Sequence, residues 1–168
     1  MTTEAIAELS PQQALFELSL LNAEKLQTEF EEVVIEGVKR GIPTEILTRL
    51  KDLWEATQDI AGEIIAIGKI IVLAIIDFLK ANPTLLAGMA LGAAVSSLVL
   101  AIPFLGPLLL PITMLLSTIY GAGVGAAMQE GDYSASPITA AIALANKFFE
   151  LLRLILKGIS QYWQAQQI

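Results

Sequence analysis

Apolar and polar positions follow a helical rhythm along this chain, and four prolines mark where helices would begin. They stand in the pairs Ser10-Pro11, Ile42-Pro43, Asn82-Pro83 and Ser136-Pro137. Proline suits the first helical position, because the N–H that it lacks would have no partner there. Ser10 with Gln13 also matches the capping-box pattern, which makes the first start the most specific. The pattern predicts an all-α protein of about five helices.

The first expected helix runs from about Pro11 to Arg40 and stops at Gly41. One arc gathers its apolar side chains, which are Leu15, Phe16, Leu20, Ala23, Leu26, Phe30, Val33, Val34 and Val38. Glutamates occupy much of the remaining circumference, which is typical of an amphipathic helix with a solvated face. This acidic surface is the candidate contact for a soluble protein partner.

The second expected helix runs from about Pro43 to Ala81 and completes an N-terminal amphipathic region of two long helices, residues 1–81. Its apolar positions alternate at spacings of four and three, as in a heptad seam: Ile46, Leu50, Leu53, Thr57, Ile60, Ile64, Ile67, Ile71, Ala74 and Phe78. Charges are frequent as far as Asp59 and sparse beyond it. The second half is therefore expected to be buried or close to lipid, with Glu63, Lys69 and Asp77 as its membrane-adjacent ionisable residues.

No charged residue occurs at the 49 positions from Ala81 to Gln129. This segment is too long for one membrane span of about 20 residues and fits two. Three prolines, Pro103, Pro107 and Pro111, mark the expected turn. We therefore expect a central hydrophobic helical hairpin over residues 82–129, with helices from Pro83 to Ile102 and from about Pro107 to Met128. The expected turn has no polar side chain, so the pattern leaves open a transmembrane hairpin or a re-entrant one.

Each half of this hairpin carries small residues at every fourth position. The two stripes are Thr84, Gly88, Gly92 and Ser96 in the first half and Thr113, Ser117, Gly121 and Gly125 in the second. Small residues let helix backbones approach closely in lipid, where packing drives association. These glycine-zipper stripes predict packing within the hairpin, or contact between subunits of a homo-oligomer.

The C-terminal region, residues 130–168, is expected to form one amphipathic helix from about Pro137 towards Gln164. Its polar stripe is narrow and consists of Lys147, Glu150, Arg153 and Lys157. Such a profile is typical of a helix that lies in a membrane interface, with Lys147, Arg153, Lys157 and Trp163 at headgroup depth. The alternative is a helix half-buried against the first two helices.

The composition of the chain excludes several kinds of catalytic site, metal site and partner. The chain contains no cysteine and no histidine, which excludes the common nucleophile systems and nearly all zinc sites. We expect no enzyme, no cofactor and no metal. The net charge is −7, and 12 of the 17 acids lie in residues 1–59, so a nucleic-acid partner is not expected.

Location follows from the same pattern. The first residues contain no basic stretch followed by an apolar run, so no secretory signal is expected. A hairpin returns the chain to the side where it began, which puts both termini on one side of the membrane. Lys69, Lys80 and Lys147 lie near the base of the hairpin and favour the cytoplasmic side.

The order of amphipathic helices around an uncharged hairpin resembles the layout of the pore-forming domain of colicins over most of the chain. The segment PFLGPLLLP also resembles the proline-rich turn of oleosins. No residue motif is shared with either family, so no functional residue carries over. Two hypotheses follow: a membrane-inserting, self-associating protein that permeabilises the bilayer, or a membrane-shaping scaffold or anchor that recruits a soluble partner through its acidic helices.

Overall fold

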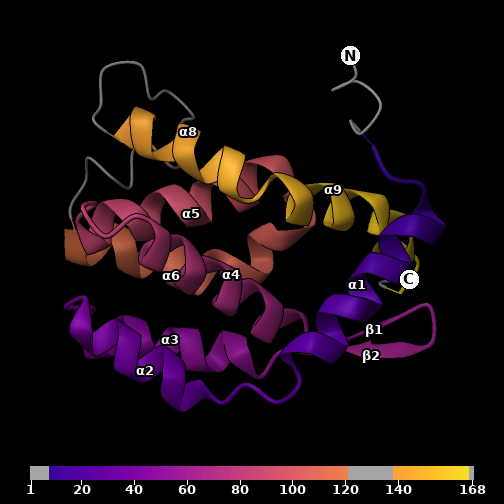
Figure 1. The fold of residues 1–168 in the computed structure, drawn as a ribbon, viewed down its shortest axis with the longest axis horizontal. Coiled ribbons are helices and arrows are strands. Elements are labelled where there is room, and N and C mark those ends of the chain that lie inside the picture. The colour runs from indigo at the N-terminus through magenta and orange to yellow at the C-terminus, as the bar shows by residue number, and fades with distance from the viewer. Residues whose placement is uncertain (1–7, 121–137, 167–168) are drawn as a thin grey trace.

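The computed structural model describes residues 8–120 and 138–166, which form a mostly helical protein (Figure 1). These residues contain nine α-helices, one short 3-10 helix and one two-stranded antiparallel sheet. The mostly helical class predicted from the pattern is confirmed. The prediction of about five long helices is wrong, because the described helices are 7 to 15 residues long.

The first expected helix is two helices, α1 (Pro11–Lys25) and α2 (Phe30–Lys39). The predicted capping box is present: Gln13 N donates to Ser10 Oγ, and Ser10 N donates to Gln13 Oε1, each at 3.1 Å. Between the helices, Lys69 Nζ donates to the Leu26 carbonyl oxygen at 3.0 Å. Lys69 thus supplies a hydrogen-bond donor to the Leu26 carbonyl oxygen, which would accept from a backbone N–H if the helix were continuous.

A β-hairpin interrupts the second expected helix, which consists of α3 (Thr44–Trp54) and α4 (Ile67–Ala81). The strands are β1 (Gln58–Ile60) and β2 (Glu63–Ile65), and Ile60 pairs with Glu63 across the turn. Both turn residues have positive φ, Ala61 at 54° and Gly62 at 89°, as a tight hairpin turn requires. Gly62 N also donates to Asp59 Oδ1 at 3.0 Å, which fixes the turn.

The β-hairpin lets α4 fold back onto α3. Gly68, at the start of α4, donates its N–H to the Ala56 carbonyl oxygen at 3.0 Å. A Cβ at Gly68 would overlap the Leu53 carbonyl oxygen, so only glycine permits this approach. The two halves of the expected long helix therefore pack against each other.

Within the expected hairpin region, two uncharged helices, α5 (Ala87–Ala101) and α6 (Gly106–Tyr120), are joined through a 3-10 turn, η2 (Pro103–Leu105), while the expected end of the second helix at Met128 lies outside the described residues. Pro83 does not start a helix, because α5 begins four residues later. Only Pro103 lies in the turn, while Pro107 is in the first turn of α6 and Pro111 is inside it. The turn is therefore shorter than the three prolines suggested.

The C-terminal region contains α8 (Ile138–Phe148), α9 (Glu150–Gly158) and α10 (Ser160–Gln166) in place of one helix. In Figure 1, α8 and α9 lie across the top, α4, α5 and α6 fill the middle, and α2 and α3 lie below. The right-hand end holds α1, α10 and the β-hairpin. Helix α5 contacts α4, α6 and α8, so the least polar part of the chain lies inside the bundle.

Candidate functional site

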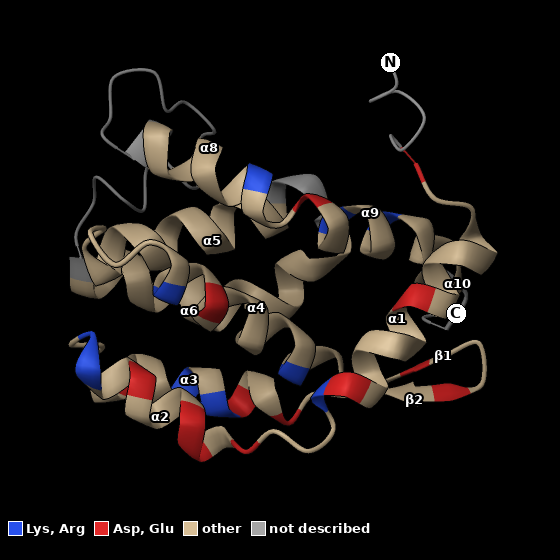
Figure 2. Ribbon diagram, viewed as in Figure 1, with Lys and Arg blue, Asp and Glu red and all other residues tan. Residues whose placement is uncertain are grey.

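The uncharged helix α5 is the centre of the molecule. Every residue from Gly88 to Leu98 is buried except Met89, which is half-buried. Helices α5 and α6 contain no charged residue, whereas α2 and α3 carry many (Figure 2). A helix that is apolar all round is stable only inside a protein or in lipid, and here neighbouring helices supply that surrounding.

Helix α8 covers α5 through a polar contact in an otherwise apolar interface. Ser97 Oγ donates to Asn146 Oδ1 at 2.7 Å. The Asn146 carbonyl oxygen in turn accepts from Arg153 Nη1 of α9 at 3.2 Å. This chain of contacts links α5 to both helices of the top layer.

The turn of the hairpin is covered by the C-terminal helix. The Phe104 ring stacks on the Trp163 ring of α10, with centroids 4.5 Å apart and planes at 25°. Ile102 and Leu105, on either side of Phe104, are buried. Trp163 itself is buried, and its indole N–H has no hydrogen-bond partner in the described part of the chain. The contact holds the tip of the hairpin inside the fold.

Arg40, just after α2, holds the chain before α5. Its Nη2 lies 3.4 Å from the Asn82 carbonyl oxygen and 3.2 Å from the Leu85 carbonyl oxygen. Asn82 Nδ2 donates to the Phe78 carbonyl oxygen at 3.0 Å. Sequence reasoning missed Arg40, because nothing local relates it to a segment about 42 residues away.

The second hairpin helix, α6, has two different faces. Leu109, Ile112 and Leu116 are buried against the rest of the protein. Leu110, Met114 and Ile119 are exposed. The hydroxyls of Thr113 and Thr118 donate to the carbonyl oxygens four residues earlier, so they are already used within the helix. The outer face of α6 is therefore apolar and uncharged.

An open groove of about 500 Å³ runs along this outer face beside α3. Leu110, Pro111, Met114 and Leu115 form most of its lining, and Arg49 of α3 is its cation. Arg49 Nη1 lies 3.1 Å from Asp52 Oδ2, and both side chains are substantially exposed. The groove thus combines an apolar wall with one guanidinium at its edge.

The small-residue stripes are placed unevenly. Gly88, Gly92 and Ser96 are buried in α5, whereas Thr84 is exposed in the preceding turn. Thr113 and Ser117 are half-buried in α6. Gly121 and Gly125 lie outside the described residues. The first stripe therefore lies in the interior of the bundle, and its pairing with the second stays a prediction.

The three membrane-adjacent ionisable candidates do not come together in one site. Glu63 is on β2, where its Oε1 accepts from Ser19 Oγ of α1 at 2.7 Å. Lys69 binds the Leu26 carbonyl oxygen and lies 5.1 Å from the centroid of the Trp54 ring. Asp77 is exposed on α4 at the edge of a pocket. Each has separate surroundings, and Glu63 is not on a helix as expected.

The residues expected in a membrane interface are divided between the surface and the interior. Lys147 and Lys157 are exposed. Arg153 is half-buried, and its Nε has no hydrogen-bond partner among residues 8–120 and 138–166. Trp163 is packed inside against Phe104, as described above. In this structure α9 packs on α1, as in the half-buried alternative, which is compatible with a place in a membrane interface, and that place stays a prediction.

No described helix has both the length and the apolar character needed to cross a bilayer. Helices α5 and α6 have 15 residues each. In the same residues, acidic side chains form no group that could hold a metal ion. No protein-family model, curated protein or solved structure matches the chain.

Proposed function

We propose that this protein binds membranes through the α5–α6 hairpin and self-associates there, permeabilising the bilayer. The observation that supports this proposal is the exposed, uncharged face of α6. A short turn joins α6 to α5, an uncharged helix held in the interior. Exposed apolar surface of this kind usually marks a contact with another apolar phase. Lipid can cover the face of α6 and then replace the protein contacts of α5.

Among the described residues, few of the contacts that hold the hairpin are polar or aromatic. A hydroxyl–amide hydrogen bond joins α5 to α8, an aromatic stack holds the turn after α5, and Arg40 holds the chain before it. The remaining contacts are apolar, and lipid tails can replace them at little cost because they are as apolar as leucine. The charge-free sequence also extends past both ends of the two helices, which leaves room for longer helices in a bilayer.

A first experiment tests whether the outer face of α6 meets lipid. Met114→Glu is expected to weaken binding to liposomes at least tenfold, because one charge in the membrane core costs about 2.5 kcal/mol or more. Ile35→Glu is the matched control, since Ile35 on α2 is 60% exposed and Met114 is 61% exposed. Equal effects of the two variants in a flotation assay would refute the role of α6.

A second experiment tests whether the hairpin must leave its cover. The chain has no cysteine, so Ser97→Cys with Asn146→Cys can introduce a single disulfide between α5 and α8. Thiol titration would verify that the bond forms. The oxidised protein is expected to release no dye from liposomes, and the reduced protein to release it. Lys51→Cys, near the end of α3, with Glu55→Cys, directly after α3, is the control for the presence of two oxidisable thiols.

The membrane-shaping alternative is favoured by one observation, the length of the helices. Fifteen residues span about 22 Å at 1.5 Å per residue, which is less than the hydrocarbon thickness of about 30 Å. A hairpin that kept this length would enter one leaflet as a wedge. Liposomes that become tubular without releasing dye would support this alternative, and release limited by dye size would support the pore.

The structure also changes how self-association should be tested. Gly88, Gly92, Gly121 and Gly125 are the expected packing residues, so Gly92→Leu is the obvious substitution for a test of helix packing. Gly92 is buried in α5, so a leucine there would disturb the folded bundle as well as any assembly in lipid. Crosslinking of the unaltered protein on liposomes is therefore the cleaner measurement of its oligomeric state in the membrane.

A further inference from the structure

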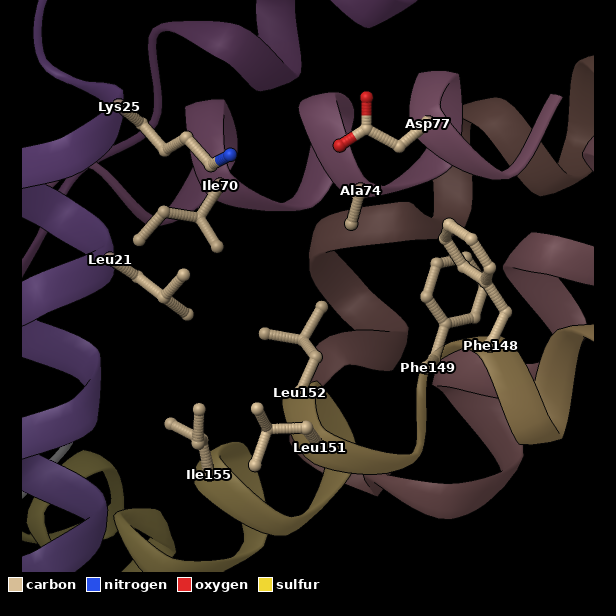
Figure 3. Close-up of a pocket in the computed structure, with 10 residues that line it drawn as sticks. All are labelled: Leu21, Lys25, Ile70, Ala74, Asp77, Phe148, Phe149, Leu151, Leu152 and Ile155. Carbon is tan, nitrogen blue, oxygen red and sulfur yellow. The ribbon is translucent and has the colours of Figure 1, made fainter. Parts of the chain in front are cut away.

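A second apolar hollow lies on a different face, between α1, α4 and the junction of α8 with α9 (Figure 3). Its volume is about 170 Å³, and Leu21, Ile70, Leu152 and Ile155 line its interior. Figure 3 shows Leu21 on one side and Leu152 on the other, both directed into the hollow. A dry cavity of about 150 Å³ accepts a benzene ring, so this one fits one large apolar side chain.

Two opposite charges stand at the edge of the hollow, Lys25 of α1 and Asp77 of α4. Neither side chain has a hydrogen bond or an ion pair with any residue that the structure describes. The adjoining hollow is lined by the same two residues together with Glu32 and Lys80. The rim therefore offers both signs of charge, and its cation and anion are free to pair with another molecule.

The same face carries apolar side chains that stand out from it. Leu151 is 59% exposed and Phe148 is 43% exposed, and both also line the hollow. Leu144, one turn before Phe148, is exposed as well. Phe148 is held by ring contacts with Phe78 and Phe149, with centroids 5.5 Å and 5.3 Å apart. The face thus presents apolar projections beside the hollow, and one of them, Phe148, is held in place by neighbouring rings.

We infer that this face binds a second copy of the same chain through a two-fold interface. In such an interface one patch meets its own copy, so it must complement itself. A projection beside a hollow, with the unpaired cation Lys25 and the unpaired anion Asp77 at the rim, has this property. Lys25 of each copy pairs with Asp77 of the other, while Leu151 or Phe148 of each copy enters the other's hollow.

Charge reversal tests the pairing in the full chain, in solution without lipid. Lys25→Glu and Asp77→Lys each place like charges together twice in the dimer. Each is expected to raise the dimer dissociation constant about tenfold, measured by sedimentation equilibrium at low salt. An equimolar mixture of the two variants restores both attractive pairs, and so does the double variant. Both are expected to dimerise as the unaltered chain does.

Net charge alone predicts a different result. Lys25→Glu makes the charge of −7 more negative by two units, and Asp77→Lys makes it less negative by two units. General repulsion would therefore weaken one dimer and strengthen the other, whereas specific pairing weakens both. Lys39→Glu on α2 is the matched control, because it changes the net charge as Lys25→Glu does and lies outside the hollow.

Leu151→Ser tests the apolar contact without altering charge, and a weaker dimer is expected. Circular dichroism and thermal unfolding would verify that every variant is folded. An unaltered chain that is monomeric at all concentrations would overturn the inference, and so would a dimer that tolerates both charge reversals. The inference is independent of the membrane proposal, because these measurements contain no lipid and the residues lie outside α5 and α6.

Discussion

Two neighbouring serines in α5 have different surroundings although both are 2% exposed. Ser97 donates to Asn146, whereas the Ser96 hydroxyl has no partner among the described residues. A buried hydroxyl without a partner lowers stability, while one that is bonded contributes to it. The same substitution at these two adjacent positions is therefore expected to change the free energy of unfolding in opposite directions.

Ser96→Ala is expected to raise the free energy of unfolding by about 1 kcal/mol, because it removes an unpaired buried hydroxyl. Ser97→Ala is expected to lower that free energy by about 1 kcal/mol, because it leaves the Asn146 amide without its donor. Urea unfolding followed by circular dichroism measures both. Two changes of the same sign would show that the hydroxyl contacts are not as described.

Asn22 is a buried polar residue that joins α1 to the β-hairpin. Its Nδ2 donates to the Ile64 carbonyl oxygen at 3.2 Å, and its Oδ1 accepts from Ala66 N at 2.8 Å. The amide thus completes two backbone hydrogen bonds where β2 ends. Nothing in the sequence marks Asn22 for this role, since its partners lie more than 40 residues away.

Asn22→Ala is expected to lower the free energy of unfolding by about 2 kcal/mol, because two backbone groups lose their partners. Ser19→Ala is the control, because it removes an exposed hydrogen bond to Glu63 between the same two elements. Its effect is expected to stay within about 0.5 kcal/mol. If both variants have equal unfolding midpoints in urea, burial of Asn22 does not add to its contribution.

At the scale of elements, the pattern predicted helices better than their ends. The capping box at Ser10 is confirmed, and α3 begins within one residue of Pro43. The β-hairpin was missed, because Ile60 and Ile64 continue the helical spacing through it. In the structure Ile60 is buried and Ile64 is exposed, which is the change that a strand imposes.

The buried face of α1 also differs from the predicted arc. Phe16 and Leu20 are exposed, whereas Ala14, Leu18 and Asn22 are buried. Apolar residues occur on all sides of this helix, so its own sequence does not select a face. Packing against α9 and α4 selects it instead. A single sequence does not contain that choice, because it depends on segments far along the chain.

The two faces of α6 are expected to respond differently to truncation. Leu116→Ala is expected to lower the free energy of unfolding by about 3 kcal/mol, because it leaves a cavity in the core. Met114→Ala, on the outer face, is expected to change it by less than about 0.5 kcal/mol. Thermal or urea unfolding measures both. A large effect at Met114 would mean that another part of the molecule covers the outer face.

For the whole molecule, the sequence predicted the uncharged helices of the candidate site but not the residues that cover them. The uncharged segment and the hairpin were visible, because charge and proline are local features. The cover was not visible, because Arg40, Asn146 and Trp163 reach the hairpin from three separate parts of the chain. The fold places the least polar helix inside, with α2 and α3 supplying much of the charged outer surface (Figure 2).

The stack of Phe104 on Trp163 gives the protein an internal optical reporter. The chain has two tryptophans, so Trp54→Phe leaves Trp163 as the single emitting indole. Because Trp163 is buried, its fluorescence is expected at short wavelength and with little quenching by iodide. Vesicles that draw the hairpin tip away from α10 would change both the wavelength and the quenching. Unchanged emission from protein that floats with vesicles would mean that the tip stays docked on α10. If the emission does change, stopped-flow mixing with vesicles would measure how fast the tip leaves α10.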